Sequence, residues 1–193
     1  MRRSFRVRAL LAAAALSAAM PGLSGLAAPA YAAEANPGYW LVASDGGIFS
    51  YGDAAFHGST GAIKLNQPIV GMASTPSGRG YWLVARDGGI FSYGDAAFHG
   101  STGAIKLNQP IVGMTSTSSG NGYWLTAGDG GIFSYGDAVF HGSAADAERS
   151  GRPRQIVSMV RTASGAGYWQ VTAAGELFAF GDAAHLGAPT GLS

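Results

Sequence analysis

The chain has 193 residues and a formal net charge of +1, with 31 glycines, no cysteine and charged side chains at only 12% of positions. This composition excludes a disordered acidic chain and a scaffold held by disulfides. Apolar residues make up 47% of the chain, enough for a hydrophobic core, and the length suits one domain. Abundant glycine without a collagen period, together with many aromatic residues, predicts short strands and tight turns, and therefore an all-β fold.

Residues 1–32 have the order of an export signal peptide. Four arginines precede the apolar run 9–20, and a stretch of small residues ends at Ala32, after which we expect cleavage. The apolar run is shorter than the ~20 residues that a membrane helix needs. The paired Arg2 and Arg3 also resemble a twin-arginine signal, so the export route stays open. We expect a secreted or cell-wall-associated protein that has no membrane partner once the signal is removed.

Removal of the signal changes the net charge. Four of the 12 basic residues leave with it while all 11 acidic residues remain, so the net charge becomes −3. Because a weakly acidic chain has no basic stripe for phosphates, we do not expect nucleic acid as a partner. Without cysteine, the exported fold must be held by packing alone.

Residues 33–193 are dominated by a repeat with a period of 42 residues. Segment 80–121 repeats segment 38–79 with four substitutions. A third copy occupies residues 122–166 and has a different, longer loop, and a looser fourth copy occupies residues 167–193. A fixed period of this size is typical of a β-propeller, in which each blade is a four-stranded sheet.

Each unit predicts four short strands joined by turns that contain glycine. In one full set they are IVGMAS at 69–74, GYWLVA at 80–85, IFSY at 90–93 and AFHG at 97–100. The second and third strands carry apolar side chains at both parities, which predicts cover on both faces, as in blades stacked around an axis. Gly71 in the first strand would allow a close approach of backbones near that axis.

The innermost strand occurs only three times, beginning at Ile69, Ile111 and Ile156, whereas the other three strands occur four times. The sequence therefore predicts an all-β, propeller-like array of about four four-stranded blades whose first blade lacks its innermost strand. Such an array either closes as a strained ring or stays an open arc that completes itself by self-association through its open edge. We expect the open arc, because an exposed apolar blade face is costly in water.

The segments GYWLVASDGGIFSYGDAAFHGS and PIVGMASTP resemble a repeat family common in exported actinobacterial proteins, where the repeats are often attached to cell-wall hydrolases. The resemblance covers about residues 36–187 and implies propeller-like repeats of uncharacterised function. The same segments resemble, more distantly, the blades of chromosome-condensation-regulator propellers. The fourth copy departs from the family pattern, because Ala174-Gly175-Glu176 stands where the other copies have Asp-Gly-Gly.

Carboxylates and histidines recur, but their spacing does not predict a catalytic or metal centre. Asp45 and Asp53 lie at opposite ends of one expected strand, about 26 Å apart at ~3.3 Å per residue, whereas glycoside hydrolysis needs its two carboxylates within about 10 Å. Aspartate beside glycine is typical of turns. His57, His99 and His141 each follow a phenylalanine, and we expect a structural or surface role for them rather than zinc binding. We therefore expect no enzyme, no cofactor and no metal.

Polar side chains recur in loops that we expect at one end of the array. Strand parity places the Asp-Gly-Gly turns and the TGAIKLNQP loops together at that end. The candidate ligand-binding residues there are Asp45, Lys64, Asn66, Gln67, Asp87, Lys106, Asn108, Gln109 and Asp129. A solvated rim is the plain alternative for each of them. The four tryptophans lie in the most apolar strand of each unit, so we expect them to pack in the core rather than to stack on sugars.

Near-identical copies present the same chemistry repeatedly, which suits multivalent binding better than a single asymmetric catalytic arrangement. We expect a non-catalytic module that binds cell-envelope or extracellular polysaccharide. A protein-interaction or adhesion scaffold is the first alternative. A propeller glycoside hydrolase is a remote one, because its acid and base would have to come from different blades.

Overall fold

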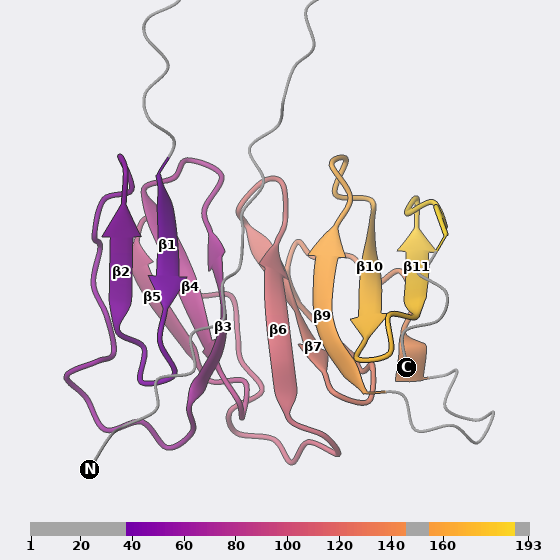
Figure 1. Ribbon diagram of the computed structural model, residues 1–193, viewed down its shortest axis with the longest axis horizontal. Helices are drawn as coiled ribbons and strands as arrows, with labels where there is room; N and C mark the ends of the chain where they lie inside the picture. Colours follow the sequence, from indigo (N-terminus) through magenta and orange to yellow (C-terminus); the bar gives the residue numbers. More distant parts are fainter. Residues whose placement is uncertain (1–37, 146–154, 188–193) are drawn as a thin grey trace, which may run out of the picture.

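The computed structural model describes residues 38–145 and 155–187, so the expected signal peptide lies outside the described residues. The described strands form four antiparallel sheets, one for each copy of the repeat (Figure 1). The sheets are β1 (Tyr39–Val42) and β2 (Ile48–Tyr51); β3 (Ile69–Ser74), β4 (Gly80–Ala85) and β5 (Ile90–Gly94); β6 (Ile111–Ser116), β7 (Gly122–Ala127) and β8 (Ile132–Gly136); and β9 (Ile156–Arg161), β10 (Gly167–Thr172) and β11 (Leu177–Gly181). In the part of the chain that the structure describes, no helix is long and apolar enough to cross a membrane.

A tight glycine turn joins the middle strand of each sheet to the outer strand. In the second sheet Ala85 N donates to Gly89 O, and Gly88 N donates to Ala85 O, each at 2.8 Å. Gly88 has a φ of +81°, and a Cβ there would overlap the Thr102 hydroxyl. The position therefore needs glycine for its backbone angle and for its space. The predicted hairpins are confirmed, and in the second sheet Leu83 on β4 pairs with Phe91 on β5.

The inner strands β3, β6 and β9 lie next to one another along one edge of the array (Figure 1). Ser116 Oγ on β6 donates to Ser74 O on β3 at 3.1 Å. A Cβ on Gly71 would lie 3.5 Å from Gly113 Cα, which confirms the expected close approach of two inner strands. The three sheets that contain an inner strand fan outward from this shared edge (Figure 1), so the predicted all-β, propeller-like architecture is confirmed.

The middle strands carry the hydrophobic core. All six residues of β4 and of β7 are buried, as their two-sided apolar pattern predicted. Trp82 and Trp124 are fully buried, which confirms the expected core role for these two, whereas Trp40 and Trp169 on the first and last sheets are only partly buried. The Trp82 ring lies 5.7 Å from that of Tyr123 on the next sheet, and Trp124 lies 5.7 Å from Tyr168 in the same way. The core is therefore a series of equivalent sheet-to-sheet interfaces.

The expectation of four strands in each blade is wrong for the described residues, because the AFHG segments pair with no strand and each sheet has two or three strands. Their backbone groups bond to side chains instead. His57 N donates to Tyr81 Oη at 3.1 Å, and Tyr81 Oη donates to Gly58 O at 2.7 Å. Trp40 Nε1 of the same unit donates to Ala55 O at 2.9 Å. We call these segments straps, since each ties one sheet to the next; they are residues 55–58, 97–100 and 139–142.

Among the described residues, the array is open at its first and last sheets. The first sheet contains only β1 and β2 among the described residues, as the missing inner-strand motif predicted. The first and last sheets lie at opposite ends of the row in Figure 1. Of the two closure alternatives, the described residues therefore form the open arc.

Candidate binding surface

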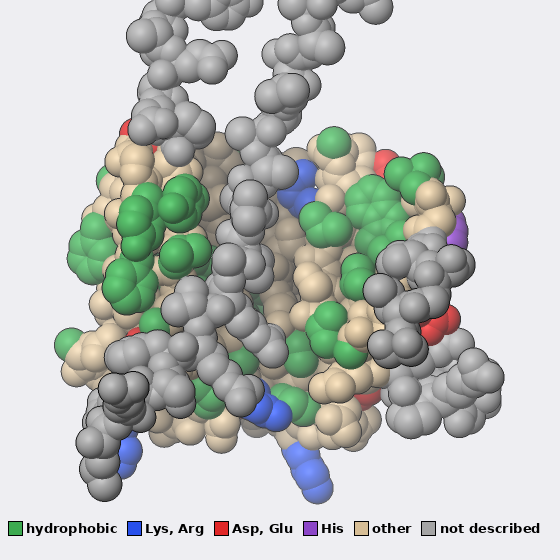
Figure 2. Space-filling view, in the orientation of Figure 1, with side chains coloured by type: hydrophobic (Ala, Val, Ile, Leu, Met, Phe, Trp, Pro, Cys, Tyr) green, Lys and Arg blue, Asp and Glu red, His purple; other side chains and the backbone are tan. Residues whose placement is uncertain are grey.

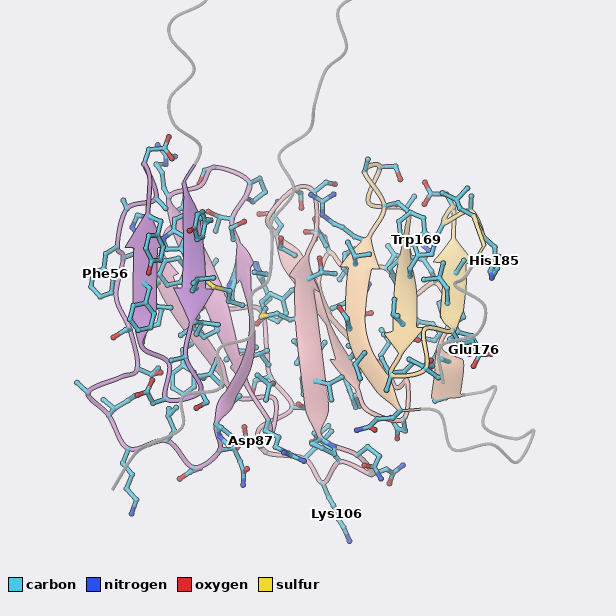
Figure 3. The ribbon with its side chains drawn as sticks, in the orientation of Figure 1. Phe56, Asp87, Lys106, Trp169, Glu176 and His185 are labelled. Carbon is cyan, nitrogen blue, oxygen red and sulfur yellow. The ribbon has the colours of Figure 1, made fainter. Side chains whose placement is uncertain are left out.

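The loops that carry the candidate residues meet at one end of the array, as predicted. Arg86 N donates to Pro68 O at 2.9 Å, and Thr102 Oγ1 donates to Asp87 O at 3.1 Å. The Asp-Gly-Gly turn thus contacts the loops on both sides of its sheet, and Figure 3 shows Asp87 and Lys106 at the same end. We call this end the polar rim. It is defined by Asp45, Lys64, Asn66, Gln67, Asp87, Lys106, Asn108, Gln109 and Asp129.

The aspartates of the polar rim each stabilise their own turn. One carboxylate oxygen of Asp45 accepts a hydrogen bond from Gly47 N at 2.9 Å. The equivalent bonds, each 3.0 Å long, join Gly89 N to Asp87 and Gly131 N to Asp129. This is the turn chemistry that aspartate beside glycine predicted. One oxygen of each carboxylate has no hydrogen bond to the described residues and can accept one from a ligand.

The fourth copy forms the same turn without aspartate. Ala174 stands at the aspartate position, and Gly175 keeps a positive φ of +82°. The hydroxyl of Thr172 accepts from Glu176 N at 3.0 Å and so replaces the missing carboxylate. The turn therefore survives in this copy without a carboxylate at the aspartate position, and its acidic residue, Glu176, stands where the other copies have the second glycine.

The lysine and amide side chains of the rim are exposed in both units that carry them. Lys64, Asn66 and Gln67 form no side-chain hydrogen bond with the described part of the chain, and the same holds for Lys106, Asn108 and Gln109. The corresponding loop of the third unit falls largely in residues 146–154, outside the described residues. Two units thus present one identical set of free donors and acceptors.

A second set of aspartates holds turns at the opposite end of the array. Asp95 accepts hydrogen bonds from Ser77 Oγ at 2.5 Å and from Thr75 Oγ1 at 2.8 Å, and Arg79 Nε lies 3.6 Å away. The Ser77 bond, followed by the Thr75 bond, holds the pKa of Asp95 below its ordinary value. Thr117 and Ser119 hold Asp137 in the same way. These carboxylates are therefore separated from the rim by the length of the sheets.

The histidines belong to the sheet-to-sheet interfaces. The His99 ring meets Tyr123 edge-on at 5.6 Å and lies 6.4 Å from Trp82. Its Nε2 is buried and has no hydrogen-bond partner in the described part of the chain, and the same is true of His57 and His141. This placement agrees with the expected structural role. Within residues 38–145 and 155–187, no group of three or more His, Asp or Glu side chains is arranged to hold a metal ion.

Sequence reasoning missed a row of exposed aromatic side chains. Phe56, Phe98 and Phe140 are 61%, 62% and 56% exposed, and each directly precedes the half-buried histidine of its strap. Figure 3 shows Phe56 at the outer edge of the array. Alternating parity within the strap was the signal that could have found them, because it places the phenylalanine and the histidine on opposite sides. The fourth copy has His185 at this position.

No protein-family model matches this chain, and no curated protein matches it. Among solved structures, the chain is similar to the β-propeller domain of Cps50 (Swd1) from Myceliophteria thermophila, with a TM-score of 0.44 and 11% identity. The match covers 74% of this chain and 48% of that chain, so this chain spans about half the length of the solved domain. The propeller-like description of this fold rests on its own sheet arrangement.

Proposed function

We propose that this chain is an exported, non-catalytic module that binds cell-envelope or extracellular polysaccharide at several equivalent sites. The observation that carries the proposal is the repetition of exposed lysine, asparagine and glutamine side chains on two successive units at one end of the array. Such a set offers donors and acceptors that match sugar hydroxyls. Export is inferred from the order of residues 1–32.

One rim set alone would bind weakly, because exposed polar groups exchange hydrogen bonds with water for hydrogen bonds with the ligand at little net gain. Two equivalent sets on one array make the second contact intramolecular, which strengthens binding by about 100-fold or more when the spacing fits. A polymer with repeating sugar units supplies equivalent contacts at regular intervals. Affinity should therefore depend strongly on glycan length.

The carboxylates support a non-catalytic role. Asp45 and Asp87 each hold the amide of their own turn, and Asp95 is bonded to Thr75 and Ser77 at the far end of the sheet. A hydrolase would need an acid and a base freed from such structural work and brought together from different sheets. The repeated, turn-bound carboxylates suit recognition of a ligand better than its cleavage.

The polar rim can be tested by replacing asparagine at the rim and, as a control, at the opposite ends of the strands. Asn66→Ala combined with Asn108→Ala removes the same exposed amide from two units, and we expect retention on isolated cell wall or its glycans to fall at least tenfold. Asn121→Ala is the matched control, because this side chain is also exposed but lies in the turn at the opposite end. Denaturation curves should be unchanged for both variants. If the unmodified chain is retained on no envelope fraction, the proposal is refuted.

The aspartates can be tested separately from their turns. Asp45→Asn with Asp87→Asn keeps an oxygen that can accept the turn hydrogen bond, but removes the charge. We expect this variant to keep its stability and to bind more weakly. The double alanine variant should lose both binding and stability. Unchanged binding by the asparagine variant would limit these two residues to a turn role.

A protein-interaction or adhesion scaffold is the second candidate, and the exposed row of Phe56, Phe98 and Phe140 favours it. Exposed aromatic side chains are common anchors at protein interfaces. Simple sugars should release a chain that is bound to polysaccharide and leave a protein-bound chain in place. Replacing all three phenylalanines by alanine should abolish protein binding while polysaccharide retention persists.

A further inference from the structure

The two free ends of the arc carry the two halves of one interface. The head face, on the first sheet, consists of Tyr39, Leu41, Phe49 and Tyr51. The tail face, on the last sheet, consists of Trp169, Val171 and Leu177 with residues 185–187. Three head-face side chains are about half exposed, at 45–49%, although the equivalent tyrosine of the second sheet is fully buried. Both faces are thus built like interior surfaces.

The interior of the molecule shows how these faces pack. On the second sheet, Tyr81 and Leu83 occupy the positions of the head face, and they lie in one cluster with Trp40, Val42 and Ile48 of the first sheet. Those three residues occupy the positions of the tail face. The third sheet packs on the second through the same positions. The free faces therefore continue, at both ends, an interface that is already established inside the chain.

Residues 185–187 at the tail face occupy strap positions of the fourth copy, but no aromatic ring of the described residues covers them. A Cβ on Gly58, Gly100 or Gly142 would lie 2.3–2.5 Å from an aromatic ring of the next sheet. Gly187 occupies the same position in the fourth copy, with a positive φ of +101°, and no atom of the described residues lies within 4 Å of such a Cβ. In the first three copies the covering ring is Tyr93, Tyr135 or Phe180. Tyr51 is the head-face residue at that register.

The side chains at the centre of the two faces also match. At the first two internal interfaces a valine and a leucine lie in one hydrophobic cluster, Val42 with Leu83 and Val84 with Leu125. The third interface uses a polar pair instead, because Gln170 Nε2 donates to Thr126 Oγ1 at 2.6 Å. The free faces return to the apolar pair, with Val171 on the tail and Leu41 on the head. The head face therefore fits the tail face without leaving a buried amide unpaired.

Both faces are found on the same side of the molecule. Figure 2 shows hydrophobic side chains gathered over β1 and β2 and again over β10, toward the viewer in each case. A second copy rotated by half a turn about an axis parallel to the inner strands would place each head face against the opposite tail face. Two contacts then form in one closed assembly, and no free face remains.

We propose that two copies of this chain close head to tail into a ring of eight sheets. Eight sheets fall within the usual range of about four to eight blades in a β-propeller. The ring doubles the number of rim sets, but its formation does not depend on which ligand the rim binds. Self-association in this ring uses the faces of the first and last sheets and not the open edge of a sheet.

Light scattering on the purified chain tests the ring directly. We expect twice the mass of one chain at micromolar concentration. Phe49→Glu on the head face and Val171→Glu on the tail face should each raise the dimer dissociation constant at least 100-fold, since both place a charge in an apolar contact. Phe98→Glu is the control, because this phenylalanine is 62% exposed and lies on neither face. A monomeric unmodified chain would overturn the proposal.

Crosslinking tests the head-to-tail order, and the absence of native cysteine makes engineered ones unique. Tyr51→Cys and Gly187→Cys are made as two separate proteins and then mixed. A short bifunctional maleimide should join the mixture into one covalent dimer and leave each variant alone unjoined. Crosslinking of Tyr51→Cys by itself would show head-to-head packing and contradict the ring. A chain that carries both cysteines should give a single dimer band, whereas a ladder of larger products would also contradict it.

Discussion

The first and second sheets have nearly the same sequence but different surroundings. Segments 38–43 and 80–85 both read GYWLVA. Nevertheless Tyr39 is 49% exposed, whereas Tyr81 is fully buried. Within the part of the chain that the structure describes, the second sheet is covered on both faces, while the first has a neighbouring sheet on one face only. Burial of this aromatic strand is therefore a property of its place in the array.

The comparison separates the stability that a side chain provides within its own sheet from the stability that contact with a neighbouring sheet adds. Tyr81 Oη bonds to the backbone of the strap before it, but Tyr39 belongs to the first sheet and has no strap before it among the described residues. The difference in unfolding free energy between identical substitutions at the two positions therefore reports what one sheet-to-sheet interface contributes to stability.

The largest effect should come from removing the buried ring. Tyr81→Ala leaves a cavity between two sheets, and we expect it to lower the free energy of unfolding by about 3–5 kcal/mol. Tyr39→Ala should lower it by about 1 kcal/mol or less when the chain is monomeric. Denaturant titration of both variants, at a concentration where light scattering shows a monomer, measures the difference. Equal losses would mean that the interfaces contribute little to stability.

Glycine in the straps provides the second pair. Gly100→Ala and Gly187→Ala both put a side chain at a positive φ, which costs about 1 kcal/mol in each case. Only at Gly100 would the new Cβ also meet the ring of Tyr135, at 2.3 Å. We expect an additional loss of about 1–3 kcal/mol there from overpacking. Thermal unfolding of the two variants, at a concentration where light scattering shows a monomer, gives this comparison, and equal shifts in Tm would show that the Tyr135 side chain moves aside freely.

The tyrosine hydroxyl provides a smaller effect. Tyr123→Phe leaves His99 N and Gly100 O without their partner, and we expect a loss of about 1–3 kcal/mol. Burial also raises the pKa of Tyr123. The stability from keeping this hydroxyl neutral is complete below about pH 10 and is lost as the pH rises further. The phenylalanine variant should show a flatter alkaline limb in its stability profile. Tyr39→Phe, which removes an exposed hydroxyl, should leave stability unchanged.

The smallest effect concerns the aspartates at the end opposite the rim. Hydrogen bonds from Ser119 and then Thr117 hold the pKa of Asp137 below its ordinary value of 3.8. A lowered pKa in the folded state means that this stability is present above about pH 4 and is lost as the pH falls below it. Ser119→Ala should therefore reduce the slope of unfolding free energy against pH between pH 2 and 5. An unchanged slope would show that the bond to Ser119 does not stabilise the charged carboxylate.

The candidate rim could be located from the sequence because strand parity decides which loops share an end. The Asp-Gly-Gly turns also follow from local chemistry, since glycine supplies the positive φ and aspartate accepts the turn amide. The exposed row that begins at Phe56 was not found in this way. Its exposure depends on the histidine beside it turning toward the next sheet.

The sequence by itself determined the repeated hairpins, the three inner strands and the missing fourth one, because these follow from glycine positions, strand parity and a fixed period. Only the tertiary structure decided that the AFHG segments would be straps. Their residues favour a strand, but the groups that satisfy their backbone are Trp40 and Tyr81, which come from two different sheets. Only the tertiary structure, too, made one GYWLVA segment an interior strand and the other an exposed face. A hydrogen bond or a packed ring between sheets depends on residues far apart in the chain, and local propensity does not contain that information.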